Sequence, residues 1–277
     1  MEYKRVLTIQ DISCVGQCSM TVALPIISAC GIETAVLPSA VLSTHTAGFS
    51  GFTVRDLAAD MPAIRQHWVK EGLRFDAVYT GYLGSAQQVD YVLDIANDCR
   101  KENFALVVDP AMADHGKLYP AFDMAYVEAM KKLCSAADYL LPNITEACFL
   151  CGMEYRTEYD EAYVLEIVRA LAAMGVKNVV LTGVSYREGR TGIVVYRNDA
   201  LEYFEHEFLP NSCHGTGDIY ASAFTGALIR GKDAFEAAKI AGEYTLECIR
   251  YTADDPSHWY GAKFEPVLWK LIEALKD

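Results

Sequence analysis

The chain has 277 residues, of which 52% are apolar and 22% charged, and this size and composition allow one or two globular domains. Its formal net charge is −13 at pH 7, with no Lys/Arg stripe, so we expect no nucleic-acid partner. The first residues predict a strand rather than a secretory signal. The sequence contains no run of 18 apolar residues, so it predicts no membrane span. We therefore expect a cytoplasmic protein with no membrane partner.

The nine cysteines are an odd number in a long chain, which predicts free thiols rather than a disulfide framework. Cys148 and Cys151 form an isolated C-x-x-C, without a second pair or histidines at zinc-site spacing. We interpret them as two core-facing thiols of one helix, with a metal or redox role as the minor alternative.

Short apolar runs alternate with helical periodicity through most of the chain. Pro25 lies inside the first predicted helix and indicates a kink or a later helix start. In chain order, the pattern predicts a strand at 6–9, a helix at 19–30 closed by Gly31, strands at 33–41 and 77–80, a helix with Val89, Val92, Leu93 and Ala96 on one face, strands at 105–109 and 139–141, a helix with Val164, Ile167, Val168 and Leu171 on one face, and a strand at 178–182.

The pattern changes after residue 190. Two further strands, at 192–196 and 203–208, flank the turn-like Asn198-Asp199, and the chain is predicted to be helical from Gly215 nearly to its end. Repeated β-α units followed by a hairpin predict an α/β fold, three-layered and doubly wound, with a mostly parallel sheet and an antiparallel edge. We expect one domain over residues 1–277, with ligands at the carboxyl ends of the strands.

The strongest chemical signal lies at residues 211–224, where a loop with two glycines runs into a helix of small residues. The backbone N–H groups of Gly215, Thr216 and Gly217 would form an anion cradle at the helix start. Asp218 follows directly, and a carboxylate beside a phosphate site suits a general base better than an anchor. The alternative is an Asp that caps the helix after a glycine turn. No G-x-x-x-x-G-K-[ST] occurs, which excludes a P-loop kinase.

Two further segments place polar side chains directly after predicted strands. Asn143 and Glu146 lie three apart, and Glu146 suits a hydrated Mg²⁺, although helix capping explains the same spacing. Asp109 ends a strand in Val108-Asp109-Pro110, with Asp114 soon after, and a turn-forming Asp-Pro is the alternative.

Together these motifs resemble the ribokinase-like kinases. The resemblance rests on GTGD at 215–218, PNxxE at 142–146 and VDP at 108–110. The N-terminal half is similar to the pyridoxal kinase branch, through the segments VLTIQ at 6–10, VG at 15–16, STHT at 43–46 and TGYLGS at 80–85. The likeness covers most of the chain in the right order, and its motifs are specific as a set.

The resemblance implies an ATP-dependent kinase that phosphorylates the 5′-hydroxymethyl group of a vitamin B6 vitamer. Asp218 would be the base, and Gly215, Thr216 and Gly217 would stabilise the transferred phosphoryl group. The resemblance also implies a homodimer, Mg²⁺ and a monovalent cation such as K⁺. It assigns the vitamer to Asp11, His45, Thr46, Tyr82 and Asp218, the metal to Glu146, Asn143 and Asp109, and ATP to Asp109, Asp114, Tyr119, Asn143, Thr182, Gly183, Gly215 and Gly217.

Two departures from the pyridoxal kinase pattern leave alternatives open. Asp11 stands where serine is expected, and Cys213-His214 before the GTGD is reminiscent of the hydroxymethylpyrimidine kinase branch. That branch commonly has Cys at the position of Asp218, which favours the B6 substrate. A hydroxymethylpyrimidine or sugar kinase, and a non-catalytic nucleotide-sensing protein, remain the alternatives. Residues 42–52, rich in Ser, Thr and Gly, are predicted to form a flap over the acceptor.

Overall fold

The computed structural model describes residues 3–210 and 213–276. Its centre is a nine-stranded sheet with the strand order β11-β10-β9-β8-β5-β4-β1-β2-β3. The strands from β9 to β2 pair in parallel, while β10 and β11 at one edge and β3 at the other pair antiparallel. The strands are β1 (Arg5–Ser13), β2 (Glu33–Leu42), β3 (Val54–Asp56), β4 (Phe75–Thr80), β5 (Arg100–Val108), β8 (Tyr139–Leu140), β9 (Asn178–Val184), β10 (Arg190–Arg197) and β11 (Ala200–Glu207), with a separate hairpin of β6 (Ala113–Asp114) and β7 (Lys117–Leu118).

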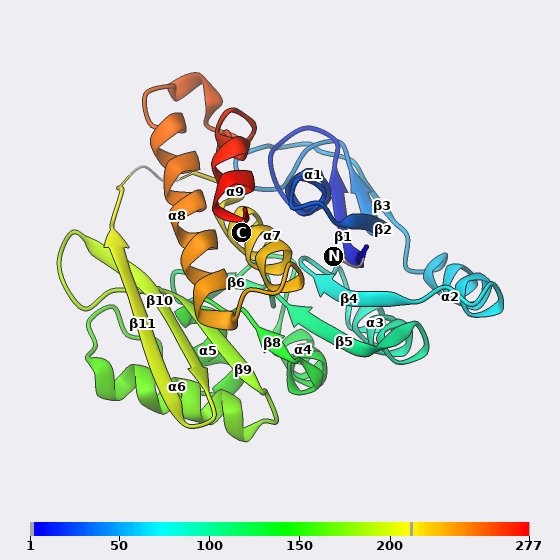
Figure 1. Cartoon of the computed structure of the whole chain (residues 1–277), viewed down its shortest axis with the longest axis horizontal. Helices are drawn as coiled ribbons and strands as arrows, with labels where there is room; N and C mark the ends of the chain where they lie inside the picture. The colour runs from blue at the N-terminus through cyan, green and yellow to red at the C-terminus, as the bar shows by residue number, and fades with distance from the viewer. Residues whose placement is uncertain (1–2, 211–212, 277) are drawn as a thin grey trace.

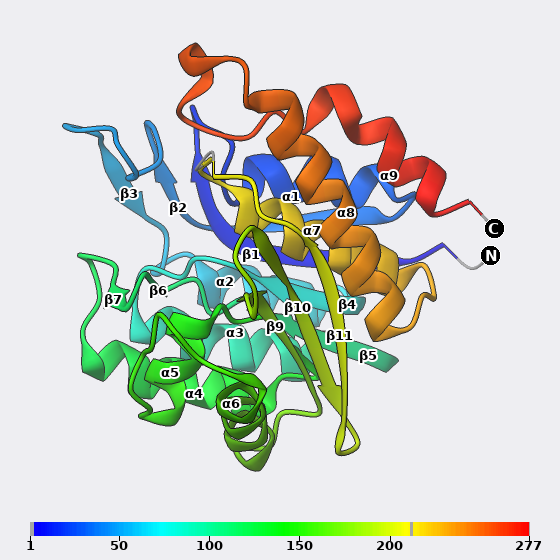
Figure 2. The same ribbon diagram turned by 90° about the vertical axis from the view of Figure 1, so that its left-hand side faces the viewer.

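Helices cover both faces of this sheet, which gives the predicted three layers (Figures 1 and 2). One face carries α1 (Met20–Ala29), α7 (Thr216–Ile229), α8 (Ala234–Thr252) and α9 (Leu268–Ala274). The other carries α3 (Ala86–Asp98), α4 (Met124–Ala136), α5 (Ile144–Cys151) and α6 (Glu161–Ala173), and α2 (Met61–Lys70) packs beside α3.

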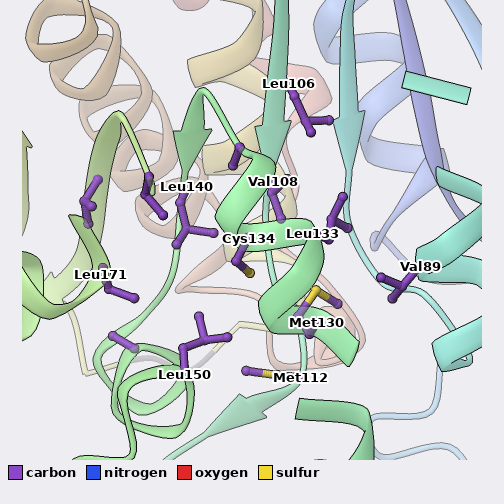
Figure 3. Packing of buried hydrophobic residues seen from close by; sticks show 14 of the residues in the cluster. Val89, Leu106, Val108, Met112, Met130, Leu133, Cys134, Leu140, Leu150 and Leu171 are labelled. Carbon is purple, nitrogen blue, oxygen red and sulfur yellow. The ribbon is translucent and has the colours of Figure 1, made fainter. Parts of the chain in front are cut away.

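The two cores follow from the alternation of side chains along the central strands. In β5, Leu106 and Val108 point into the core under α3–α6, whereas Val107 points into the core under α1 and α7. Figure 3 shows Leu106 and Val108 packed with Leu133 and Leu140. Strands buried on both faces have no polar side to expose, which explains their near-continuous apolar sequences.

The predicted fold class, strand sequence and C-terminal helices are confirmed, with three differences. Helix α1 begins at Met20 and includes Pro25, so the later start is wrong. Strand β1 runs to Ser13 rather than ending at Ile9, so Asp11 lies within the strand. Strand β3 and helices α2 and α4 were not predicted. Helix α2 fully buries only Met61, and its apolar stripe is short, with Ile64 and Trp68 partly buried against the core.

The parallel strands bring their carboxyl ends to one edge of the sheet, and the residues that follow them carry the polar groups. Asp109 follows β5, Asn143 lies just beyond β8, and Thr182 pairs with Asn143 in a parallel bridge beside them. At the opposite end, Asn198 and Asp199 both have positive φ and close the β10–β11 hairpin tightly. None of the described helices is long and apolar enough to cross a membrane.

Candidate active site

Helix α7 begins with the glycine pair that the sequence singled out. Gly215 is the N-cap in a left-handed conformation, φ 78°, and a Cβ there would lie 1.8 Å from the carbonyl oxygen of Gln17. Only glycine fits that position. Gly217, in the first turn, has no atom within 4 Å of an added Cβ, so the space in front of it is open. The first N–H groups of a helix lack helical acceptors, so this end of α7 offers N–H donors to an anion.

Asp218 lies in the same first turn and has a pKa raised to about 7. Burial is the largest cause, followed by repulsion from Asp109, with a further contribution from Asp11, while a hydrogen bond from the N–H of Ser19 opposes these effects. A carboxyl group that titrates near neutral pH takes up and releases a proton readily at that pH. The environment of Asp218 therefore fits the role of a general base.

Asp11 lies close to Asp218, although 207 positions separate them in the sequence. Its side chain is buried and accepts a hydrogen bond of 3.0 Å from Ser13 Oγ and another from the Ser19 hydroxyl. Burial raises the pKa of Asp11, and the nearby carboxylate in turn contributes to the raised pKa of Tyr82 after burial. Asp11 and Tyr82 thus lie close together beside the start of α7.

Ser19 is the residue that sequence reasoning missed. It is the N-cap of α1, but its hydroxyl makes no capping bond and instead reaches Asp11, while its N–H reaches Asp218. Its backbone is strained for a non-glycine residue, with φ 53° and ψ −128°. A serine before a helix predicts an ordinary cap, so no local signal reveals this conformation.

A second carboxylate group lies at the ends of β5 and β8. Asn143 and Glu146 form a capping box for α5, and Glu146 also accepts a hydrogen bond of 3.0 Å from the N–H of Met112. The Asn143 amide donates to the carbonyl of Ala113, so both of its polar atoms are engaged. The capping alternative for these two residues is thus realised in the structure.

The hydrogen bonds of the capping box do not offset the effect of burial on the pKa of Glu146. Burial raises its pKa well above the usual range, and repulsion from Asp109 raises it further. The pKa of Asp109 is itself raised to about 6 by burial, although the N–H of Ala111 donates to its Oδ1. Two crowded, buried carboxylates disfavour double ionisation unless a cation lies between or beside them.

The donor chemistry of this pair fits a hydrated Mg²⁺, which prefers oxygen ligands and usually takes one or two carboxylates plus waters. Within the described part of the chain, no three His, Cys, Asp or Glu side chains gather closely enough to hold a metal alone. Asp109 is the better candidate for direct contact, since Glu146 already accepts two main-chain hydrogen bonds.

A cavity of about 390 Å³ opens beside this pair and brings together four of the residues predicted to bind ATP, Asp114, Asn143, Thr182 and Gly183. That volume lies within the usual range for a small-molecule site. The rest of its wall combines apolar and aromatic side chains, such as Ile144, Tyr155 and Phe208, with polar ones that include Arg190. The cavity can therefore hold a partly polar ligand.

The remaining predicted residues have distinct surroundings. Tyr119 is 38% exposed, and its pKa is raised by burial and then by Glu146, Asp114 and Asp109, which places it near these carboxylates. Tyr82 is half-buried and packs against Phe122, with ring centroids 5.3 Å apart. His45 is buried and Thr46 is exposed on the same loop.

The cysteines are free, as predicted. Cys148 is buried and Cys151 half-buried on α5, and burial is the first cause of the raised pKa of each thiol. Cys213 is half-buried with a pKa raised by burial, which lowers its thiolate fraction and argues against a nucleophile. Asn211 and Ser212, the first residues of the predicted cradle segment, lie outside the described residues.

Comparison with known proteins places this geometry in a family. The model of the phosphomethylpyrimidine kinase family matches residues 24–262. The pyridoxal kinase of Dictyostelium discoideum is 30% identical over 244 residues, which cover 82% of this chain and 78% of that protein.

Solved structures agree. A candidate phosphomethylpyrimidine kinase from Bacteroides thetaiotaomicron, crystallised with pyridoxal, is 35% identical, with a TM-score of 0.91 over 98% of this chain and 96% of that one. The pyridoxal kinase of Lactobacillus plantarum is 31% identical, with a TM-score of 0.91 over 98% of both chains. The chain therefore belongs to the phosphomethylpyrimidine kinase family and, like its pyridoxal kinase relatives, is a ribokinase-like kinase that transfers a phosphoryl group to an alcohol.

Proposed function

We propose that this kinase transfers the γ-phosphate of ATP to the 5′-hydroxymethyl group of a vitamin B6 vitamer. The observation that carries the proposal is the position of Asp218, a carboxyl group with a pKa of about 7 in the first turn of a helix that begins with Gly215 and has open space at the Cβ position of Gly217. The similarity to pyridoxal kinases, and to a structure that contains pyridoxal, supports the substrate class.

In the proposed reaction the Asp218 carboxylate takes the proton of the hydroxymethyl O–H. The alkoxide oxygen forms a bond to the γ-phosphorus as the bond from that phosphorus to the β–γ bridging oxygen breaks, which yields the phosphate ester and ADP. The N–H groups at the start of α7 stabilise the charge on the transferred phosphoryl group. These donors come from the main chain, so the site does not depend on basic side chains, which acidic ones outnumber in a chain with a net charge of −13.

The nucleotide is proposed to occupy the cavity lined by Asp114, Asn143, Thr182 and Gly183, with its phosphates directed toward Gly217. Mg²⁺, held by Asp109 and through water by Glu146, would supply positive charge to the phosphates and relieve the repulsion between these carboxylates. We extend the proposal to a homodimer on the family resemblance alone.

A hydroxymethylpyrimidine kinase is the second candidate, because the matching family model is named for phosphomethylpyrimidine, a related pyrimidine, and His214 precedes the glycine pair. A coupled ADP-release assay with pyridoxal, pyridoxine, pyridoxamine and hydroxymethylpyrimidine separates the two. We expect the highest kcat/KM with a B6 vitamer. A hydroxymethylpyrimidine kcat/KM above that of all three vitamers would reverse the assignment.

Asp218→Asn should lower kcat by about 10²–10⁴, the range for loss of a positioned general base. In the wild type, kcat should fall as pH drops through about 7, because the raised pKa keeps Asp218 protonated below that pH. Stopped-flow or steady-state assays over pH 5–9 would measure both effects. The variant should bind ATP and melt no lower than wild type at pH 8, since it removes a buried charge. Activity within threefold of wild type would falsify the role.

Gly217→Val should lower kcat by about 10² without unfolding the protein, since the Cβ position at Gly217 is open and the added side chain would occupy the space beside the cradle. Circular dichroism and the ADP-release assay would separate fold from function. The contrasting variant is Gly215→Ala, which clashes with Gln17 and should lower Tm. A folded Gly217→Val protein with full activity would place the phosphate site elsewhere.

Asp11→Ser should change the ranking of the vitamers. A carboxylate can pair with a protonated ring nitrogen or an aminomethyl group, and such charge-assisted bonds are roughly twice as strong as neutral ones. The wild type should therefore prefer pyridoxamine or pyridoxine over pyridoxal, and the variant should lose that preference. The measurement is kcat/KM for each vitamer in both proteins. An unchanged ranking would mean that Asp11 serves only Ser13 and Ser19.

A further inference from the structure

Four segments that are distant in the sequence meet at the buried ring of His45. Gly16, with φ 118°, approaches so closely that a Cβ there would lie 2.1 Å from the His45 ring. Phe49 packs edge-on with ring centroids 4.9 Å apart, and His214, which directly precedes the cradle glycine, lies at 5.5 Å. The carbonyl oxygen of Tyr260 is 2.6 Å from His45 Nε2.

Two hydrogen bonds to main-chain groups engage both ring nitrogens of His45. The N–H of Ala47 donates to Nδ1 at 3.2 Å. The carbonyl of Tyr260 accepts from Nε2 at 2.6 Å. Both ring nitrogens are therefore occupied, and neither is left to bind a substrate hydroxyl or ring nitrogen.

The flap, residues 42–52, has a second attachment to the same C-terminal segment. Phe49 packs against Trp259 with centroids 4.7 Å apart. Gly48 has φ 83°, and a Cβ there would lie 2.7 Å from the Trp259 ring, so the main chain of the flap rests directly on the indole. Trp259 is nevertheless 48% exposed, so it covers the flap from outside rather than belonging to the core.

The C-terminal strap, which we define as residues 256–265, also reaches the cradle. The N–H of Ala262 donates to the carbonyl of His214 at 3.1 Å. Gln17, whose carbonyl faces Gly215, packs against Gly261 and donates to Glu265 at 2.8 Å. The strap thus contacts the flap, the β1–α1 loop and the start of α7 at once.

We propose that His45 is a positioning residue and that Trp259, through Phe49 and Gly48, holds the flap closed over the acceptor. The strap then decides whether the phosphoryl group is transferred to the vitamer or to water. This inference rests on the proposed function. A kinase with a small alcohol as acceptor must exclude water, which competes as a nucleophile. The strap would exclude water by holding the flap in place, and none of its residues 256–265 belongs to the proposed catalytic groups.

The test compares Trp259→Ala with Trp269→Ala. Trp269 is the matched control, because it is also about half exposed but lies on α9, where its ring contacts Lys270. ADP and phosphorylated pyridoxal are measured together. Trp259→Ala should raise KM for pyridoxal roughly threefold to tenfold, the effect of losing an aromatic pair. It should also release more ADP than ester, and release ADP without vitamer. Trp269→Ala should match wild type.

His45→Phe and His45→Gln separate packing from hydrogen bonding. Phe keeps the ring but loses both bonds, whereas Gln retains an N–H donor for the Tyr260 carbonyl, so Gln should retain tighter coupling of ADP to ester. Hydrogen exchange of residues 42–52 without ligands should be faster in Trp259→Ala and His45→Phe than in Trp269→Ala.

Two results would overturn the inference. One is a Trp259→Ala protein that matches Trp269→Ala in the ADP-to-ester ratio. The other is an equal rate of hydrogen exchange of residues 42–52 in these two variants. A wild type without activity on any vitamer would overturn the proposed function instead. The exchange comparison, which needs no substrate, would then still decide whether the strap holds the flap.

Discussion

The repulsion among buried carboxylates at one edge of the sheet is the constraint on which the site depends. Asp11, Asp109, Glu146 and Asp218 come from four different segments, and burial raises the pKa of each. Their convergence costs stability at neutral pH, because it disfavours ionisation of groups that are ionised in the unfolded chain. A fold tolerates this cost where the site uses it, and here the result is one carboxyl group that titrates near neutral pH and a pair that suits a cation.

Structural and chemical roles coincide in several of these residues. Asn143 and Glu146 complete a capping box, yet Glu146 remains close enough to Asp109 for their charges to interact. The cap fixes the orientation of the Glu146 carboxylate through two main-chain N–H donors, which is what a water-mediated metal site requires of a supporting group. Helix capping and metal support are therefore compatible in one side chain.

The strained serine and the buried histidine have related positions beside the start of α7. Ser19 interacts with both Asp11 and Asp218 and lowers the pKa of each, so one residue of unfavourable backbone conformation serves two carboxyl groups. His45 joins the flap to the strap by using both ring nitrogens on main-chain groups. Neither residue needs to touch the reacting atoms to control the geometry in which they meet.

The sequence alone determined the fold class, the strands of the parallel sheet and the glycine-led start of α7, because these depend on local composition. Runs such as 106–108 and 179–181 are apolar throughout since both faces are buried, and a glycine-rich helix start needs no distant partner to be recognised. Helix α4 also carried a readable signal, with Tyr126, Met130, Leu133 and Cys134 on its buried face.

Only the tertiary structure decided the electrostatics and the contacts of the site. The pKa of Asp218 depends on its burial and on Asp109 and Asp11, and the Nε2 of His45 bonds to a carbonyl 215 residues away. Likewise, the spacing of Asn143 and Glu146 allowed a cap or a metal site and favoured the cap, and their reciprocal hydrogen bonds show that the cap is formed, while Met112 and Ala113 add partners that the spacing did not indicate. Charge interactions and hydrogen bonds act through space, so residue spacing along the chain cannot specify them until the sheet brings its strand ends together.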